Sequence, residues 1–89
     1  MTDSSEFEKL YPSVFPLKVI GRNESSFYEL VVELVSHHVP GLPPEAFSTT
    51  RSKKGNYMSV SVTFVAQSRS QVSDLYRELT SHPRILMAL

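Results

Sequence analysis

Residues 57–66 alternate between two kinds of side chain, and this alternation constrains the fold more than any other feature of the chain. One set is apolar and consists of Met58, Val60, Val62, Phe64 and Ala66. The other set is mostly hydroxylic and begins with Tyr57, Ser59, Ser61 and Thr63. Because successive side chains of a strand point to opposite faces, the pattern predicts a sheet that is covered on one face and open on the other.

Three further segments are predicted to be strands. Residues 13–20 alternate in the same way, and residues 84–89 form a short apolar segment. A polar strand is expected over residues 47–52, with Phe47 and Thr49 facing the core and a turn over the next four residues. The last strand is expected at the edge of the sheet, with Leu86 and Ala88 on the open face. An apolar edge strand is a pairing liability.

Two amphipathic helices are predicted between these strands. Apolar side chains recur at helical spacing after Ser26 and again after Ser68. Glu29 and Gln71 follow these two serines at the spacing of a capping box, in which each side chain of the pair bonds a free amide at the start of the helix. A proline follows the end of each apolar stripe and stops the helix.

The predicted order is therefore β-α-β-β-α-β. Right-handed crossovers then give an α+β ferredoxin-like sandwich, in which a four-stranded antiparallel sheet of order 4-1-3-2 carries two helices on one face. Eighty-nine residues leave room for one domain, expected over residues 10–89 after a flexible polar tail over residues 1–9.

Composition excludes several kinds of site. The chain has no cysteine, so it has neither disulfides nor thiolate metal ligands. His37 and His38 are adjacent on a helix and point about 100° apart, which suits packing better than chelation of one ion. No nucleophile–base arrangement is evident, so we expect no metal, no cofactor, no catalytic residue and no enzymatic activity. The N-terminus lacks a signal-like apolar run and no segment is long enough to span a membrane, which predicts a cytoplasmic protein without a membrane partner.

Charge is balanced overall but uneven along the chain. Residues 1–46 hold seven acidic and three basic residues, whereas residues 47–89 hold six basic and two acidic ones. The halves interleave in one folded domain, so this asymmetry need not persist in space. A net charge of zero argues against general nucleic-acid binding. RNA binding stays a lesser alternative, because the positions of the stacking aromatics after Lys54 in an RNA recognition motif hold Asn56 and Met58.

Several motifs together resemble the YbeD-like family of small bacterial proteins. They are Leu10, Phe15, Lys18 and Gly21 in and around the first strand, the run from His38 to Gly41, the hairpin residues Ser52, Gly55–Tyr57 and Ser59–Ser61, and Val72, Leu75, Tyr76 and Leu79 of the second helix. The resemblance covers residues 10–89. The chain departs from the family pattern between Gly41 and Thr50, which leaves the register of the second strand open. The resemblance implies a fold like that of ACT regulatory domains, which bind small metabolites and pair side by side, and it implies no catalytic activity.

Two functional hypotheses follow. The first is an adaptor that binds a partner protein or a second copy of itself through the open face, the hairpin and the last strand. The expected contact residues are Lys18, Lys53, Lys54, Gly55, Tyr57, Ser59 and Ser61. The alternative is an ACT-like sensor of a small anionic metabolite or amino acid, bound where Gly21, Arg22 and Asn23 precede the first helix.

Overall fold

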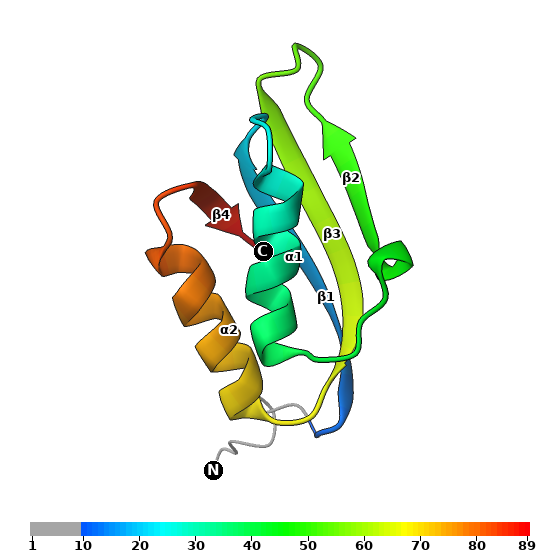
Figure 1. Ribbon diagram of the computed structural model, residues 1–89. Helices are drawn as coiled ribbons and strands as arrows, with labels where there is room; N and C mark the ends of the chain where they lie inside the picture. The colour runs from blue at the N-terminus through cyan, green and yellow to red at the C-terminus, as the bar shows by residue number, and fades with distance from the viewer. Residues whose placement is uncertain (1–9) are drawn as a thin grey trace.

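The computed structural model describes residues 10–89, and the predicted tail over residues 1–9 lies outside the described residues. The elements, in chain order, are β1 (Ser13–Arg22), α1 (Phe27–His38), the short 3₁₀ helix η2 (Pro44–Ala46), β2 (Phe47–Arg51), β3 (Tyr57–Ala66), α2 (Arg69–Ser81) and β4 (Ile85–Ala88). Figure 1 shows both helices in front of one side of the sheet.

The four strands form one sheet in the order β2-β3-β1-β4, which confirms the predicted ferredoxin-like topology. The two central strands, β1 and β3, pair antiparallel over their whole length, from Ser13 opposite Ala66 to Arg22 opposite Tyr57. The second strand pairs with β3 from Phe47 opposite Val62 to Arg51 opposite Met58, which settles its register. The long central pair thus forms the platform on which both faces are built.

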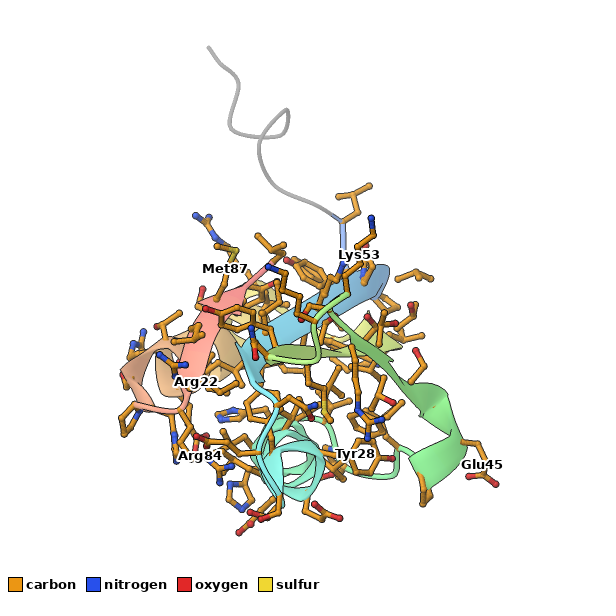
Figure 2. The ribbon with its side chains drawn as sticks, turned by 90° about the horizontal axis from the view of Figure 1, so that it is seen from above. Arg22, Tyr28, Glu45, Lys53, Arg84 and Met87 are labelled. Atoms are coloured by element: carbon orange, nitrogen blue, oxygen red, sulfur yellow. The ribbon has the colours of Figure 1, made fainter. Side chains whose placement is uncertain are left out.

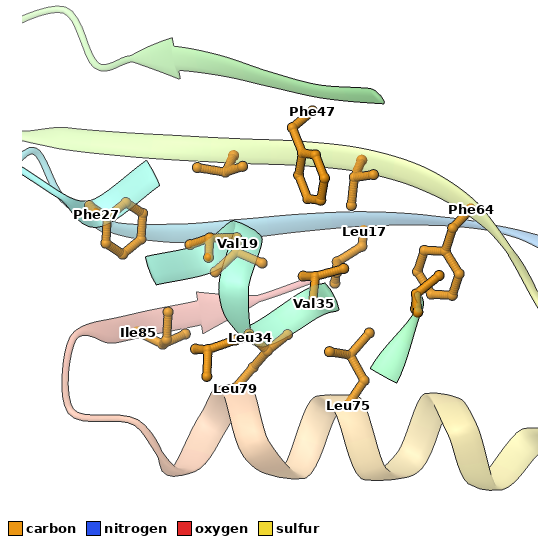
Figure 3. Packing of buried hydrophobic residues seen from close by; sticks show 14 of the residues in the cluster. Leu17, Val19, Phe27, Leu34, Val35, Phe47, Phe64, Leu75, Leu79 and Ile85 are labelled. Carbon is orange, nitrogen blue, oxygen red and sulfur yellow. The ribbon is translucent and has the colours of Figure 1, made fainter. Parts of the chain in front are cut away.

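The hydrophobic core lies between this sheet and the two helices (Figure 3). The alternation predicted for β3 is observed, since Met58, Val60, Val62, Phe64 and Ala66 are all buried. The helices contribute Phe27, Val31, Leu34, Val35, Leu75 and Leu79 to the same cluster. Fully burying one such large apolar side chain stabilises a fold by about 1.5–3 kcal/mol, so this side of the sheet provides the main stabilisation.

Pro16 lies in the middle of β1 without disrupting the ladder. Lys18, two residues later, exchanges both main-chain hydrogen bonds with Leu89, so its amide points away from β3. By the two-residue period, the nitrogen of Pro16 points the same way, past the end of β4. The missing N–H therefore costs no hydrogen bond to β3. It also removes one free donor from the part of the β1 edge that β4 does not cover, where another strand could otherwise pair.

The two predicted capping boxes differ in the structure. Ser68 caps α2, since its hydroxyl accepts a bond from the Gln71 amide at 3.1 Å, although the Gln71 side chain returns to the amide of Gln67 rather than to that of Ser68. Ser26 makes no capping bond. Its backbone is left-handed, with φ of 66°, rather than in the extended conformation that N-cap residues typically adopt.

Three predicted strand details also need correction. The first strand continues two residues further than expected, to Arg22, which places Gly21 inside β1. Phe47 is buried as predicted, but Thr49, which lies on the same side of the edge strand β2 opposite Val60, is exposed. In β4, the register shifts between Ile20 and Gly21 of β1, so Ala88 lies opposite Val19 and packs against the core instead of facing away from the helices.

Candidate functional site: the open face of the sheet

The side of the sheet away from α1 and α2 is the candidate site and is called the open face. Strand register assigns to it Val14, Pro16, Lys18, Ile20 and Arg22 of β1, Ser48 and Thr50 of β2, Tyr57, Ser59, Ser61, Thr63 and Val65 of β3, and Met87 and Leu89 at the end of the chain. Figure 2 shows Lys53 and Met87 on this side, with Tyr28 and Arg84 on the helix side.

The open face gathers most of the large apolar side chains that solvent reaches. Within residues 10–89, seven large apolar side chains are exposed, and five of them lie on this face. They are Val14, Tyr57, Val65, Met87 and Leu89, with exposed fractions from 42% to 65%. Exposed apolar side chains scattered singly are ordinary, whereas a set gathered on one face marks a contact surface.

Charge is segregated between the two layers of the molecule. The four strands contain Lys18, Arg22 and Arg51 but no acidic residue. The acidic residues of the described chain lie in the helices, in η2 or in the connection before α1, and they are Glu24, Glu29, Glu33, Glu45, Asp74 and Glu78. The open face thus presents Lys18, Arg22 and the nearby Lys53 without a carboxylate side chain, so folding converts the uneven charge of the sequence into a basic surface.

Two shallow depressions flank Lys18 along β1. The first has a volume of about 290 Å³ and is lined by Pro16, Leu17, Lys18, Ser61, Val62, Thr63 and Leu89. The second has a volume of about 230 Å³ and is lined by Lys18, Ile20, Thr50, Arg51, Ser52, Tyr57, Met58 and Ser59. Both lie at or below the lower end of the roughly 300–1,000 Å³ of pockets that enclose a small molecule, and they are large enough for single protruding side chains.

The predicted hairpin residues lie at one end of this face. Ser52 closes the turn between β2 and β3, since its hydroxyl accepts a bond from the Tyr57 amide at 3.1 Å. Gly55 adopts the expected positive φ, 75°, and Lys53 and Lys54 are exposed beside it. Of the predicted contact residues, Lys18, Tyr57, Ser59 and Ser61 therefore share the open face, and the two lysines with Gly55 border it.

The loop predicted to hold a metabolite has a structural role in this fold. Gly21 is buried in β1, where a β-carbon would lie 2.2 Å from Cε1 of Phe27. The side-chain amide of Asn23 donates to the carbonyl of Gly55 at 2.9 Å, which fastens this loop to the hairpin. Neither depression includes Gly21, Arg22 or Asn23 in its lining. Metabolite sensing there stays a prediction that a thermal-shift screen would test.

The start of α1 is also occupied from within the chain. The guanidinium of Arg84, just before β4, donates to the carbonyl of Ser25 at 3.1 Å and lies 3.4 Å from a carboxylate oxygen of Glu24. It also sits 6.0 Å from the centre of the Phe27 ring. These contacts fix the connection before the helix. They place the guanidinium of Arg84 beside Ser26, at the helix start where the metabolite was expected to bind.

The adjacent histidines of α1 share one partner on α2. The Nε2 of His38 hydrogen-bonds to Glu78, and the Nδ1 of His37 lies 3.7 Å from the other oxygen of the same carboxylate. The hydrogen bond to His38, aided by the charges of both histidines, lowers the pKa of the Glu78 carboxyl. No group of three or more potential metal ligands occurs within residues 10–89. The histidines therefore join the two helices on the side opposite the open face.

Sequence reasoning missed part of the open face. Val14 belongs to it, and continuing the alternation of β1 by one step before Pro16 would have found this residue. Met87 and Leu89 replace the expected Leu86 and Ala88, because the register shift between β1 and β4 exchanges the faces. A shift of one residue always has this consequence in a strand, and nothing in the residue types of β4 marks it.

None of the helices in the described residues is long and apolar enough to cross a membrane.

Comparison with known proteins identifies the family. The family described as "Protein of unknown function (DUF493)" matches residues 8–89. A UPF0250 protein of Leptothrix cholodnii is 40% identical over 79 residues, covering 89% of this chain and 87% of its own. Another, from Nitrosomonas europaea, is 34% identical over the whole of both chains.

A solved structure supports the fold independently. The solution structure of protein HP0495 from H. pylori aligns with a TM-score of 0.68 at 15% identity, covering 100% of this chain and 96% of that one. At that identity the likeness concerns the fold alone. The family match and the whole-length relatives confirm the resemblance drawn from the sequence, and the chain belongs to the DUF493 family of YbeD-like, UPF0250 bacterial proteins.

Proposed function

We propose that this protein is a non-enzymatic cytoplasmic module that binds a partner protein, or a second copy of itself, through the open face. The observation that carries the proposal is that, of the seven large apolar side chains exposed within residues 10–89, five gather on one sheet face. Interface centres are apolar with few charges and have polar rims, and the serine and threonine hydroxyls around these side chains fit such a rim.

The absence of enzymatic activity is part of this proposal and has structural support. The serines on the face are Ser48, Ser59 and Ser61, and Ser59 donates to the carbonyl of Thr50 at 3.4 Å. The three histidines of the chain lie at the ends of α1 and α2, on the other side of the sheet. Within residues 10–89, no histidine or carboxylate side chain therefore lies beside these hydroxyls to activate them, and Lys18, opposite Ser61, is exposed to solvent.

Affinity capture with surface variants tests the proposal. The full chain, the double variant Tyr57→Ala/Met87→Ala and the helix-face control Glu33→Ala would each be immobilised and exposed to extract of the native cells. We expect a protein held by the wild type and by Glu33→Ala and lost from the double variant, because Tyr57 and Met87 are exposed on the open face. Light scattering over a concentration series measures whether the wild type and the same variants self-associate.

The contrary outcome is equally definite. A wild type that stays monomeric at high concentration and retains nothing that the double variant loses would remove the open face as a contact surface. Stabilisation of the wild type by a common metabolite in a thermal-shift screen would instead favour the sensor hypothesis.

A further inference from the structure

We propose that the open face binds an acidic and apolar segment of a partner protein in an extended conformation, with a carboxylate of that segment on Lys18 and apolar side chains in the two flanking depressions. The inference rests on the proposed function and specifies the chemistry of the partner.

The charge of the face is the first argument. Lys18 stands at its centre, opposite Ser61 of β3, and Arg22 and Lys53 lie toward the hairpin end. Within residues 10–89, none of these three cations has a carboxylate side chain within ion-pair distance. Complementary charge on a partner steers association and fixes its orientation, so an acidic segment fits this surface.

The same charges disfavour a second copy placed face to face. Such a pairing would bring two sets of Lys18, Arg22 and Lys53 together without an acidic side chain from either open face to balance them. Like charges juxtaposed at an interface weaken it and select against that partner. The apolar side chains of the open face are therefore better matched by a chain that brings its own carboxylates.

The geometry of the depressions points to an extended segment. One depression runs from Pro16 to Lys18 and the other from Lys18 to Ile20, so both lie along β1 with Lys18 between them. In an extended chain, alternate side chains lie on one side and are about 6.6 Å apart. A segment with an apolar residue, an acidic residue and another apolar residue at every second position would place one side chain in each depression and a carboxylate on Lys18.

Single-stranded RNA fits the face less well. Nucleic-acid strands bind such sheets by stacking bases on exposed aromatic rings. Within the strands, Tyr57 is the aromatic residue that the register places on this side, whereas Phe15, Phe47 and Phe64 face the helices. One ring at the end of the face provides no platform for successive bases.

Fluorescence anisotropy with designed peptides tests the inference on the full chain. The probe is a labelled peptide of about twelve residues, long enough to run the length of β1 when extended, with phenylalanine and glutamate at alternating same-side positions and serine between them. One matched peptide carries lysine in place of glutamate, and a second carries alanine in place of phenylalanine. A labelled oligouridine of similar length is the nucleic-acid ligand for comparison.

We expect the acidic peptide to bind, and its affinity to fall when salt rises from about 50 mM to about 500 mM. Lys18→Glu should weaken peptide binding at least about fivefold, and Lys53→Glu should weaken it by a smaller factor. Arg77→Glu on α2 should change the affinity by less than about twofold. Arg77 is a matched control because it is exposed in the opposite layer. Circular dichroism of each variant verifies that it is folded.

The contrary results separate this inference from the proposed function. Absence of acidic-peptide binding, or equal binding of the lysine peptide, overturns the acidic partner while leaving capture by the open face intact. Concentration-dependent dimerisation lost in Tyr57→Ala/Met87→Ala, without peptide binding, identifies the second copy as the occupant. Tighter binding of oligouridine than of the acidic peptide overturns the inference and the proposed function together.

Discussion

The two faces of the sheet come from the same strands and differ in what they hold. On the covered face, side chains such as Val19 and Val60 are fully buried against both helices. On the open face, residues one position away, such as Lys18 and Ser61, remain in contact with solvent. The difference teaches that stability is concentrated on one side of the molecule and leaves the other side free to vary for binding.

The sharpest way to break this comparison is to truncate one apolar side chain on each side. Leu75→Ala should lower the free energy of unfolding by about 2–5 kcal/mol, because it leaves a cavity where the side chain is fully buried. Val65→Ala on the open face should change it by no more than about 0.5 kcal/mol. Urea denaturation followed by circular dichroism measures both, and similar losses for the two variants would contradict the comparison.

Overpacking of the covered face is expected to have the next largest effect. Gly21→Ala should cost about 1–3 kcal/mol, since the added methyl group would meet the Phe27 ring and lie 2.7 Å from the carbonyl oxygen of Arg84. Thermal unfolding of the variant measures this loss. In the background of Phe27→Leu, the cost should shrink, because the ring atoms that crowd position 21 are gone. An equal cost in both backgrounds would assign it to the carbonyl of Arg84 instead of the Phe27 ring.

The N-termini of the two helices allow a comparison within the covering layer, with a smaller expected effect on stability. Ser68→Ala should destabilise the protein by about 1 kcal/mol, because the Gln71 amide loses its acceptor. Ser26→Ala should change stability by no more than about 0.3 kcal/mol, because the hydroxyl of Ser26 caps no helix amide. Chemical denaturation of both variants under identical conditions provides the measurement, and equal losses would mean that Ser26 caps α1 after all.

The smallest predicted effect concerns the ion pair that joins the helices. The folded-state pKa of Glu78 is lowered, so its contribution is present above the ordinary glutamate pKa and is lost as pH falls through the lowered value. Glu78→Gln should cost about 0.5 kcal/mol at neutral pH, a modest value because the Glu78 side chain is 37% exposed. Unfolding curves of wild type and variant should converge once the pH is low enough to protonate Glu78, and a difference that persists in strong acid would refute this assignment.

Much of the fold could be predicted because its signals are local. The alternation over residues 57–66 specifies which side of β3 is buried, and every apolar residue of that set is in the core. The spacing of apolar residues located both helices, and the Ser68 cap follows from neighbouring residues in the chain. Such features depend on residues a few positions apart, so the sequence carries their physical cause in full.

Other features depend on partners distant in the chain. The left-handed Ser26 borders Arg84, and Asn23 meets Gly55 across the end of the sheet. The register shift in β4 depends on how that strand docks against Ile20 and Gly21. No local pattern encodes these contacts, and two of them changed a prediction: the cap at Ser26 and the residues of β4 on the open face.

The sequence by itself determined the order of the elements and the apolar side of each central strand, because both follow from side-chain periodicity. Only the tertiary structure decided that the acidic residues gather in the helix layer while Lys18, Arg22 and Lys53 share a surface with the exposed apolar side chains. Charge is counted along the chain but acts across space, and folding alone sets which charges become neighbours.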